Sequence, residues 1–515
     1  MPTDIQAPEI FYGALSPMLI VFAAATLGVL VEALAPAERR RILQIVVAVG
    51  GLLGALGAVA VLALSNDTAT LTAGDAIAVD GPTLFVQGIL AVLGILYILL
   101  LAERGIDASG GAVVAQASTT PGSREDMRLA DSAIMQTEVF PLAMFSLGGM
   151  MLFPASNNLL LMFVALETLS FPLYLMAGLA RRRRLLSQEA AVKYFLLGAF
   201  ASAFFIYGVA LLYGYAGSVD AGRIFDATGD AGSNDVLLYL GLAMLTVGLL
   251  FKIGAVPFQA WTPDVYQGSP TPVTALMAAC TKISAFGAVL RVFYVAVGRD
   301  QWDWRPMMWG IAIITMVVGA ILAVTQTDVK RMLAYSSVAH TGFILLGVIA
   351  ISRSGLSSTL FYLGTYGFAT MAAFAIVTLV RDSSGEATHL AQWTGLGRRS
   401  PLVAGVFAFL LFGFAGIPLT SGFMAKFAVF QAASAGGAGI LVVVGVIASA
   451  ITAFFYARVV VLMFFNEPAP DGPTVAIPSP LTATTIALGV AVTLVLGVFP
   501  QPVLELADRA ALFIR

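Results

Sequence analysis

Long apolar runs constrain the possible folds of this 515-residue chain more than any other feature. The hydrocarbon core of a bilayer needs about 20 consecutive apolar residues per helix. Fourteen segments of that kind alternate with short loops: 11–33, 42–64, 83–102, 133–153, 158–180, 188–215, 236–256, 271–297, 307–326, 332–352, 357–380, 401–432, 438–465 and 481–510. Only 11% of the residues are charged, against about 25% in a typical soluble domain. The sequence therefore predicts an all-α polytopic membrane protein with about 14 transmembrane helices.

The basic residues in the loops distinguish the two sides of the membrane. Cytoplasmic loops carry an excess of lysine and arginine, and one set of alternate loops is richer in these residues than the other. We therefore expect both termini on the non-cytoplasmic side. The richer set holds 39–41, 181–184, Arg104, Arg124, Arg128, Lys330, Arg331, Arg381, Arg398 and Arg399, and the poorer set holds Arg223, Arg299, Arg305, Arg353, Arg509 and Arg515.

Lysines are concentrated inside the apolar segments. Lys193, Lys252, Lys282 and Lys426 fall within predicted spans, whereas most arginines lie in loops. An ionisable group at mid-membrane costs about 3 kcal/mol on insertion scales. Arginine stays charged almost anywhere, but the pKa of lysine changes readily on desolvation. The pattern therefore predicts titratable cations in the membrane. Lys193 is the weakest candidate, because Glu189 one turn earlier could pair with it.

One acid and one histidine also lie deep in apolar segments. Glu167 is about eight residues into its span, or roughly 12 Å deep at a rise of about 1.5 Å per residue. His340 occupies a similar position in another span, and the unperturbed pKa of histidine is near physiological pH. A helix-clamping ion pair for Glu167, snorkelling for Lys252 and a carbonyl hydrogen bond for His340 are the structural alternatives. We interpret these residues as members of a proton relay.

Two proline-containing stretches interrupt apolar segments in the two halves of the chain. AVPFQAW and GIPLTSGF each lie within eight residues of a lysine. A matching pair of interrupted segments is typical of transport sites built from inverted repeats. The titratable residues have matching spacings, with 85 residues from Glu167 to Lys252 and 86 from His340 to Lys426. Backbone groups freed at membrane depth need protein or water. The breaks are therefore expected to line hydrated cavities in which the lysines bind protons.

Several other classes of function lack support in the sequence. The single cysteine, Cys280, excludes an iron–sulfur cluster or a structural zinc site built from this chain alone. No G-x-x-x-x-G-K-[ST] phosphate loop is present, and no G-x-G-x-x-G convincingly follows a strand. No basic patch with interleaved aromatic residues indicates nucleic-acid binding. We therefore expect neither a metal nor a cofactor on this chain.

Four motifs together resemble one known family. They are FKIGAVPFQAWTPDVYQGSPTPVTALMAACTKI, LETLSFPLYLMAG, DVKRMLAYSSVAHTGF and GIPLTSGFMAKF. These motifs are similar to those of the antiporter-like membrane subunits of respiratory complex I, the NADH–quinone oxidoreductase. The resemblance covers roughly residues 130–460. The resemblance implies broken helices 7 and 12 and two inverted five-helix repeats. The implied units are an N-terminal three-helix segment with a cytoplasmic loop (1–130), the first repeat (131–297, helices 4–8), the second repeat (298–465, helices 9–13) and a C-terminal helix 14 (466–515).

The resemblance also assigns roles to the buried titratable residues. Glu167 would be the fifth-helix glutamate, and Lys252 the seventh-helix lysine paired with it. Lys282 and His340 would be central relay members. Lys426 would be the twelfth-helix lysine leading to the outer half-channel. The remaining residue of this set, matched less securely to the sixth helix, is Lys193.

The implied activity is proton translocation within NADH:quinone oxidoreductase, driven by quinone reduction in other subunits. NADH, FMN, iron–sulfur clusters and quinone are expected on those other subunits. The implied partners are the lipid bilayer of the bacterial inner membrane and other complex I membrane subunits, especially neighbouring antiporter-like and small membrane subunits, with no nucleic acid. A cation/proton antiporter subunit of the related multi-subunit type is the first alternative, which co-purifying partners would distinguish. A non-pumping scaffold whose charges only clamp helices is the second.

Overall fold

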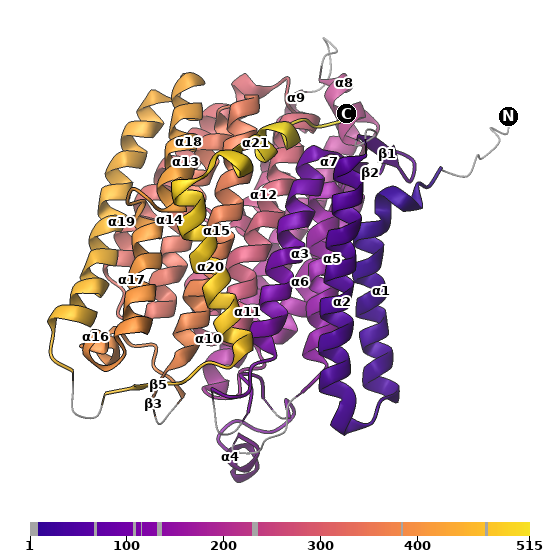
Figure 1. Cartoon of the computed structure of the whole chain (residues 1–515). Helices are drawn as coiled ribbons and strands as arrows, with labels where there is room; N and C mark the ends of the chain where they lie inside the picture. Colours follow the sequence, from indigo (N-terminus) through magenta and orange to yellow (C-terminus); the bar gives the residue numbers. More distant parts are fainter. Residues whose placement is uncertain are drawn as a thin grey trace.

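The computed structural model describes residues 9–65, 69–106, 110–114, 116–130, 136–228, 235–382, 385–468 and 472–514. Within these ranges, twelve helices are long and apolar enough to cross a membrane, and two more apolar helices, Val139–Ala155 and Pro401–Ala415, are shorter. Together they match the fourteen predicted segments, which confirms the all-α polytopic class (Figure 1). Residues 133–135 of the fourth predicted segment, together with Met1 and Arg515, lie outside the described residues.

The first three membrane helices pack at one edge of the bundle (Figure 1). Asp80 caps the third of them by accepting a hydrogen bond from the Thr83 amide at 3.2 Å. Pro82 suits the first turn, where a helix amide has no carbonyl partner. The elements are α1 (Tyr12–Leu34), α2 (Ala37–Leu64), the antiparallel hairpin of β1 (Thr70–Thr72) and β2 (Ile77–Val79), α3 (Gly81–Leu101) and, in the following loop, α4 (Arg124–Ala130).

The next stretch of chain forms the core of the bundle. The last membrane-crossing run of this stretch, 271–296, is buried except for the half-buried Tyr294, whereas α7 exposes apolar side chains such as Phe200 on its outer face. That run contains two π-helical turns, η1 and η2, which flank α12. The elements are α5 (Val139–Ala155), α6 (Leu159–Ala177), α7 (Arg184–Ala216), α8 (Ala221–Ala227), α9 (Asp235–Ile253), α10 (Trp261–Gly268), α11 (Thr271–Leu276), η1 (Met277–Thr281), α12 (Lys282–Arg291) and η2 (Val292–Ala296).

The remaining helices pack against this core and complete the bundle. A small three-stranded sheet of order β4-β3-β5 lies at one end of it (Figure 1). The elements are α13 (Gln301–Val324), α14 (Val329–Ile349), α15 (Arg353–Leu379), β3 (Val380–Asp382), β4 (Gly385–Glu386), the 3₁₀ turn η3 (Leu390–Trp393), α16 (Leu396–Arg399), α17 (Pro401–Ala415), α18 (Ser421–Ala435), α19 (Gly439–Phe465), β5 (Thr474–Val475), α20 (Pro480–Val498) and α21 (Gln501–Ala510).

Both predicted helix breaks are present, and the first of the two interrupted spans ends three residues earlier than predicted. The span predicted as 236–256 ends at Ile253, and the chain resumes as α10 after residues 254–260. The span predicted as 401–432 is two helices, α17 and α18, separated by residues 416–420. A glycine in the left-handed region follows each first half, Gly254 with φ 73° and Gly416 with φ 83°. Glycine adopts this conformation without steric cost, so the sequence ends each half-helix sharply. The division into inverted repeats remains a prediction.

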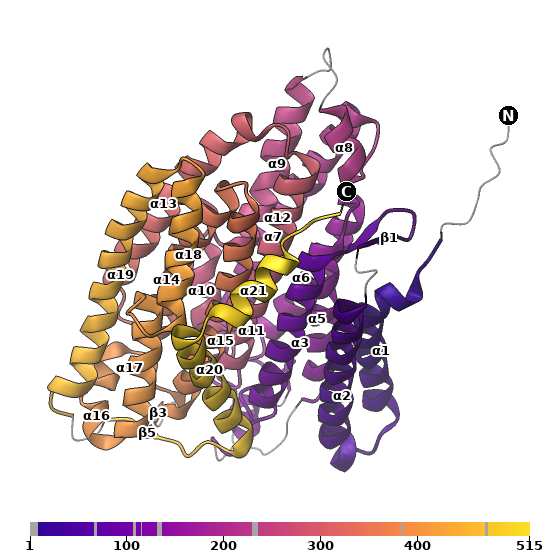
Figure 2. The same cartoon turned by 45° about the horizontal axis from the view of Figure 1, so that its top comes forward.

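Two buried polar clusters hold α3 against distant parts of the chain. The Glu103 carboxylate, just beyond α3, accepts hydrogen bonds from Ser479 and from Thr482 Oγ1 (2.7 Å) at the start of α20. At the other end of α3, Arg291 Nη2 lies 2.8 Å from Asp80 Oδ1, and both side chains are at most 1% exposed. Helix α21 then crosses from α20 over α15 towards α3 (Figure 2). The last two helices therefore fasten the second half of the bundle to the N-terminal layer.

The described chain ends lie at the same end of the bundle, and the arginine-rich connections lie at the other end. Helix α4, β3 and β5 mark the arginine-rich end at the bottom of Figure 1, and α21 and the hairpin of β1 and β2, near the described chain ends, lie at the top. This arrangement agrees with an even number of spans.

Candidate functional site

Lys252 is buried at the first helix break. It occupies the last turn of α9 and is 4% exposed. Its Nζ donates to Ser170 Oγ on α6 at 2.6 Å and to the hydroxyl of Tyr194 on α7 at 3.4 Å. The rings of Tyr174 and Tyr194 lie 5.8 and 5.4 Å from the ammonium. Hydroxyls and aromatic rings therefore solvate the charge.

Glu167 does not contact Lys252 directly. Its carboxylate is half-buried on α6 and accepts a hydrogen bond from Ser202 Oγ on α7. Ser202, Ser170 and Lys252 all line one cavity of about 10 Å³, which has room for about one water molecule. The resemblance implied a direct ion pair between Glu167 and Lys252. In the structure, Glu167 instead bonds to Ser202, and Lys252 bonds to Ser170.

Lys193 belongs to a separate, partly exposed cluster of charges. Its Nζ lies 2.6 Å from Glu189 and 2.6 Å from Asp264 on α10, and its side chain is 40% exposed. Asp264 also pairs with Arg331 on α14. The intrahelical pair with Glu189 considered as the structural alternative is therefore present. Asp264 was not predicted as a site residue, although it lies in the first turn of α10, just after the first break.

Lys282 connects the first break to the centre of the bundle. It directly follows the π-helical turn η1, and its Nζ donates to the Ser337 carbonyl at 2.7 Å and to Thr341 Oγ1. Thr341 Oγ1 in turn donates at 2.8 Å to the carbonyl of Ile253, the residue after Lys252. One threonine thus joins Lys282 to the end of the half-helix that carries Lys252.

His340 lies among tyrosines between Lys282 and the second half of the bundle. Its Nδ1 is 2.7 Å from the Tyr362 hydroxyl, and its Nε2 is 3.4 Å from the Tyr456 hydroxyl. The Tyr366 ring lies 4.8 Å from the imidazole ring and 5.8 Å from Lys282 Nζ. His340, Tyr362 and Tyr366 line a second cavity of about 10 Å³. The hydrogen-bond partners of His340 are therefore hydroxyl groups, and not the backbone carbonyl that was the structural alternative.

Lys426 is buried at the second helix break. Its Nζ donates to the carbonyl of Ala415, the last residue of α17, and to Ser449 Oγ, both at 2.9 Å. The Phe343 ring lies 4.7 Å from the ammonium. Carbonyls at a helix C-terminus carry partial negative charge, so the end of α17 stabilises the cation.

Lys330 is a further buried lysine, and its predicted place in a loop was wrong. It lies in the first turn of α14, is 2% exposed, and donates at 2.7 Å to the carbonyl of Ser269, the residue directly after α10. A cavity of about 80 Å³ adjoins it and is also lined by Arg183 and Glu386. Its adjacency to Arg331 made it resemble an ordinary loop cation in the sequence.

The buried lysines share one electrostatic property. Among the described residues, no carboxylate lies within 4.0 Å of the ammonium groups of Lys252, Lys282 or Lys426. Removing an ion from water without a charged partner costs several kcal/mol. The described part of the chain also contains no group of three or more His, Cys, Asp or Glu side chains that could hold a metal ion. The lysines are therefore poorly suited to clamping helices through ion pairs.

Comparisons with known proteins agree on one family. The family model described as NADH:quinone oxidoreductase/Mrp antiporter, TM, matches residues 156–452. The NADH-quinone oxidoreductase subunit N of Parafrankia sp. (strain EAN1pec) is 62% identical, over 98% of this chain and 96% of its own length. The subunit N of Rhodococcus opacus (strain B4) is 61% identical, over 99% and 98%.

Solved structures show the same fold. A chain of respiratory complex I from Thermus thermophilus with bound aureothin superposes with a TM-score of 0.75 at 32% identity, over 96% of this chain and 99% of that one. A chain of the Mrp complex from Dietzia sp. DQ12-45-1b superposes with a TM-score of 0.81 over 98% and 97%, but at only 22% identity. At this identity, the similarity to the Mrp chain supports a shared fold and not a shared function.

Proposed function

The chain belongs to the antiporter-like membrane subunits of NADH-quinone oxidoreductase, in the group of subunit N, and we propose that it translocates protons through its buried lysines and histidine. Quinone reduction in other subunits would supply the energy. On this proposal the chain contributes the translocase activity of the complex and no redox site of its own.

The observation that carries the proposal is the burial of Lys252, Lys282 and Lys426 without carboxylate partners among the described residues. Each is at most 5% exposed, and the hydrogen bonds that each makes to described residues go to hydroxyl or carbonyl groups. A permanent charge in that setting would be costly, whereas a lysine that gains and loses a proton needs such an environment only transiently. This argues against a scaffold in which charges only clamp helices.

The proposed route follows the contacts across the middle of the bundle. It runs from Lys252 to Lys282, which Thr341 holds beside the Ile253 carbonyl at the end of the half-helix that carries Lys252, and then past the Tyr366 ring to His340. From His340 it continues to Lys426. The cavities beside Lys252 and His340 each have room for about one water molecule, which would complete the hydrogen-bonded chain.

Glu167 would control the first step electrostatically. Its carboxylate favours the protonated form of Lys252, although serines separate the two groups. Because Glu167 is half-buried on α6, a neighbouring membrane subunit could change its position or charge. Withdrawing the carboxylate would favour release of the Lys252 proton towards Lys282.

The proposal extends to location and partners. The chain would span the bacterial inner membrane next to other antiporter-like and small membrane subunits of complex I. The arginine-rich end of the bundle would face the cytoplasm, and both chain ends the opposite side. A cation/proton antiporter subunit is the second candidate, because the matching family model also covers Mrp antiporters. Identities of about 60% over nearly the whole chain favour the first.

Replacing Glu167 with glutamine tests the proposal. NADH-driven acidification of inverted membrane vesicles should fall relative to NADH oxidation, because the charge that holds the Lys252 proton is lost. Glu467→Gln is the matched control, since Glu467 lies exposed in the loop after α19, where its carboxylate is 3.7 Å from Arg398 of α16. Unchanged acidification per NADH in an assembled Glu167→Gln complex would count against a role for this carboxylate.

A further inference from the structure

Asp264 connects three helices next to the first helix break. It lies in the first turn of α10, where its Oδ2 is 2.6 Å from Lys193 Nζ on α7 and its Oδ1 is 2.5 Å from Arg331 Nη1 on α14. Arg331 also donates at 3.1 Å to Gln267 Oε1, one turn further along α10. An isolated exposed ion pair contributes little to stability. Here one carboxylate is shared by cations from two other helices, so these contacts hold α10 between α7 and α14.

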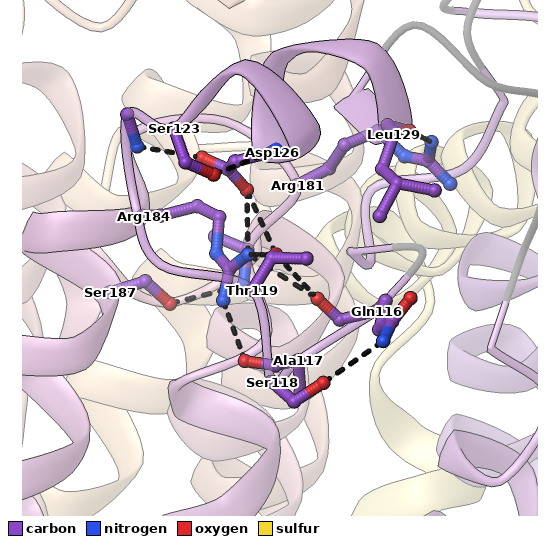
Figure 3. Close-up of polar contacts among 12 residues, drawn as sticks. Gln116, Ala117, Ser118, Thr119, Ser123, Asp126, Leu129, Arg181, Arg184 and Ser187 are labelled. Atoms are coloured by element: carbon purple, nitrogen blue, oxygen red, sulfur yellow. Dashed lines mark hydrogen bonds and ion pairs between the residues drawn. The ribbon is translucent and has the colours of Figure 1, made fainter.

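Helix α10 has little support from its own stretch of chain. It has only eight residues, no side chain caps its N-terminus, and it directly follows the break at 254–260. Helices this short are not stable by themselves. Helix α7, by contrast, is anchored at its start, because Arg184 Nη1 lies 2.7 Å from Asp126 and Nη2 donates at 2.8 Å to the Ala117 carbonyl (Figure 3). The ion pairs of Asp264 therefore attach a short helix to an anchored one.

The contact between α7 and α10 continues directly beside Lys252. Tyr194, the residue after Lys193, stacks on Trp261 of α10 with 4.7 Å between the ring centroids and 11° between the ring planes. Tyr194 is fully buried, and its hydroxyl lies 3.4 Å from Lys252 Nζ. Trp261 Nε1 donates at 3.0 Å to the carbonyl of Phe251, the residue before Lys252. The position of α10 therefore determines the position of a ring that encloses the Lys252 ammonium.

Helix α10 lies between Lys252 and the arginine-rich end of the bundle (Figure 1). Its last residues, Gln267 and Gly268, line the cavity of about 80 Å³ beside Lys330, which has room for several water molecules. The cavity beside Lys252 measures only about 10 Å³. Because Trp261 begins α10, the ring stack lies at the Lys252 end of the helix and the larger cavity lies at the other end.

We propose that Asp264 is a positioning residue that holds α10 against α7 and α14 and thereby keeps water from the arginine-rich end away from Lys252. Lys193 Nζ is also 2.6 Å from Glu189 on its own helix, so this lysine keeps a partner when α10 moves away. Lys193 and Arg331 then lack the carboxylate between them, and two like charges repel one another. The inference rests on the proposed function only for the role of Lys252 as a proton carrier.

Thiol labelling at position 252 measures this access directly. Lys252→Cys, alone or together with Asp264→Asn, is purified in the assembled complex and placed in nanodiscs, which leave both faces accessible. The complex is treated with aminoethyl methanethiosulfonate, and the labelled fraction of this chain is followed by mass spectrometry. We expect about tenfold faster labelling with Asp264→Asn, which corresponds to about 1.4 kcal/mol in the free energy of opening. Asp264→Glu keeps the charge and should label slowly.

Three further measurements separate the contact between the helices from a general loosening. Glu189→Gln is the matched control, because it removes a carboxylate 2.6 Å from the same ammonium without detaching α10. Cys280 is fully buried in η1, and its labelling reports unfolding of the bundle. Trp261→Leu should also speed labelling. Combining it with Asp264→Asn should give less than the product of the two effects, because the carboxylate acts through the ring stack.

Equal labelling of position 252 with aspartate and with asparagine at position 264 would overturn the proposal. Labelling with Glu189→Gln as fast as with Asp264→Asn would also overturn it, since the contact between α7 and α10 would then not matter. A parallel rise at Cys280 would show that the whole bundle had loosened. None of these rates depends on proton transfer, so wild-type translocation by Lys252→Ala would contradict the proton route and leave the labelling result unchanged.

Discussion

Lys426 Nζ donates to the carbonyl of Ala415, the last residue of α17, at 2.9 Å. The lysine thus binds the end of the half-helix that precedes its own, on the other side of the break. The arrangement stabilises the ammonium through the C-terminal carbonyls of a helix. It also means that the break has a function beyond ending the helix, because an uninterrupted helix would have no free carbonyl at this depth.

Lys426→Arg separates charge from proton exchange at this position. Arginine keeps the positive charge near the Ala415 carbonyl but does not release its proton under physiological conditions. We expect an assembled complex with at least a tenfold lower rate of proton translocation. Translocation at the wild-type rate would show that Lys426 acts only as a fixed charge. The measurement is NADH-driven vesicle acidification, with Arg398→Lys at an exposed position of α16 as the control.

Ser170 and Ser202 should act as a pair. Ser170→Ala removes the 2.6 Å partner of Lys252, and Ser202→Ala removes the donor to Glu167. Hydrogen bonds to charged groups contribute about 1.5–3 kcal/mol, so each variant should lower translocation about tenfold. Because both serines line the same cavity, the double variant should lose less than the product of the single effects. If the losses of translocation in the two single variants multiply fully in the double variant, the two charges are not coupled. Ser354→Ala, at an exposed position, serves as the control.

Glu103 should stabilise the packing of α20 against α3. Burial alone would raise the pKa of Glu103, but hydrogen bonds from Ser479 and Thr482 outweigh this effect and hold the pKa below its usual value. Glu103→Ala leaves those donors without their acceptor, at a cost of about 1–3 kcal/mol each. We expect a lower midpoint of thermal unfolding with unchanged coupling in the folded complex. A wild-type midpoint would contradict this role.

The contact between Asp126 and Arg184 should give the loop 116–130 a defined pH dependence. Burial alone would raise the pKa of Asp126, but the Gly122 amide and Arg184 outweigh it and hold the pKa below its usual range. A carboxylate with a lowered folded pKa stabilises the protein above its unfolded pKa of about 3.9 and loses that effect as the pH falls further. Protection of this loop from hydrogen exchange should therefore be constant from neutral pH to about pH 5 and fall below about pH 4. A loss of protection near pH 6 would identify a different group.

The membrane spans could be predicted because every helix in lipid must be apolar over its length. The breaks could be predicted from proline within such segments. Their boundaries could not, because α10 consists of the polar motif WTPDVYQG, and hydropathy alone places that motif in a loop. Helix α10 is nevertheless largely buried, since it packs against α7 and α14.

The candidate lysines could be located in the sequence, but their partners could not. Ser170 is 82 residues from Lys252, and Thr341 is 59 residues from Lys282, so only tertiary packing brings each pair together. The expected ion pair between Glu167 and Lys252 became two serine contacts for the same reason. Lys330 was misplaced because its neighbour Arg331 resembles a loop cation, whereas α14 begins one residue earlier and turns Lys330 inward.

The most direct test of the account is NADH-driven acidification of inverted vesicles carrying Lys252→Ala, measured together with NADH oxidation and complex assembly. Arg398→Ala on the exposed side of the short helix α16 controls for the loss of a cation. The account predicts normal assembly with less acidification per NADH, or with both rates reduced together, because the first buried lysine of the route is gone. Wild-type acidification and oxidation in an assembled Lys252→Ala complex would contradict it.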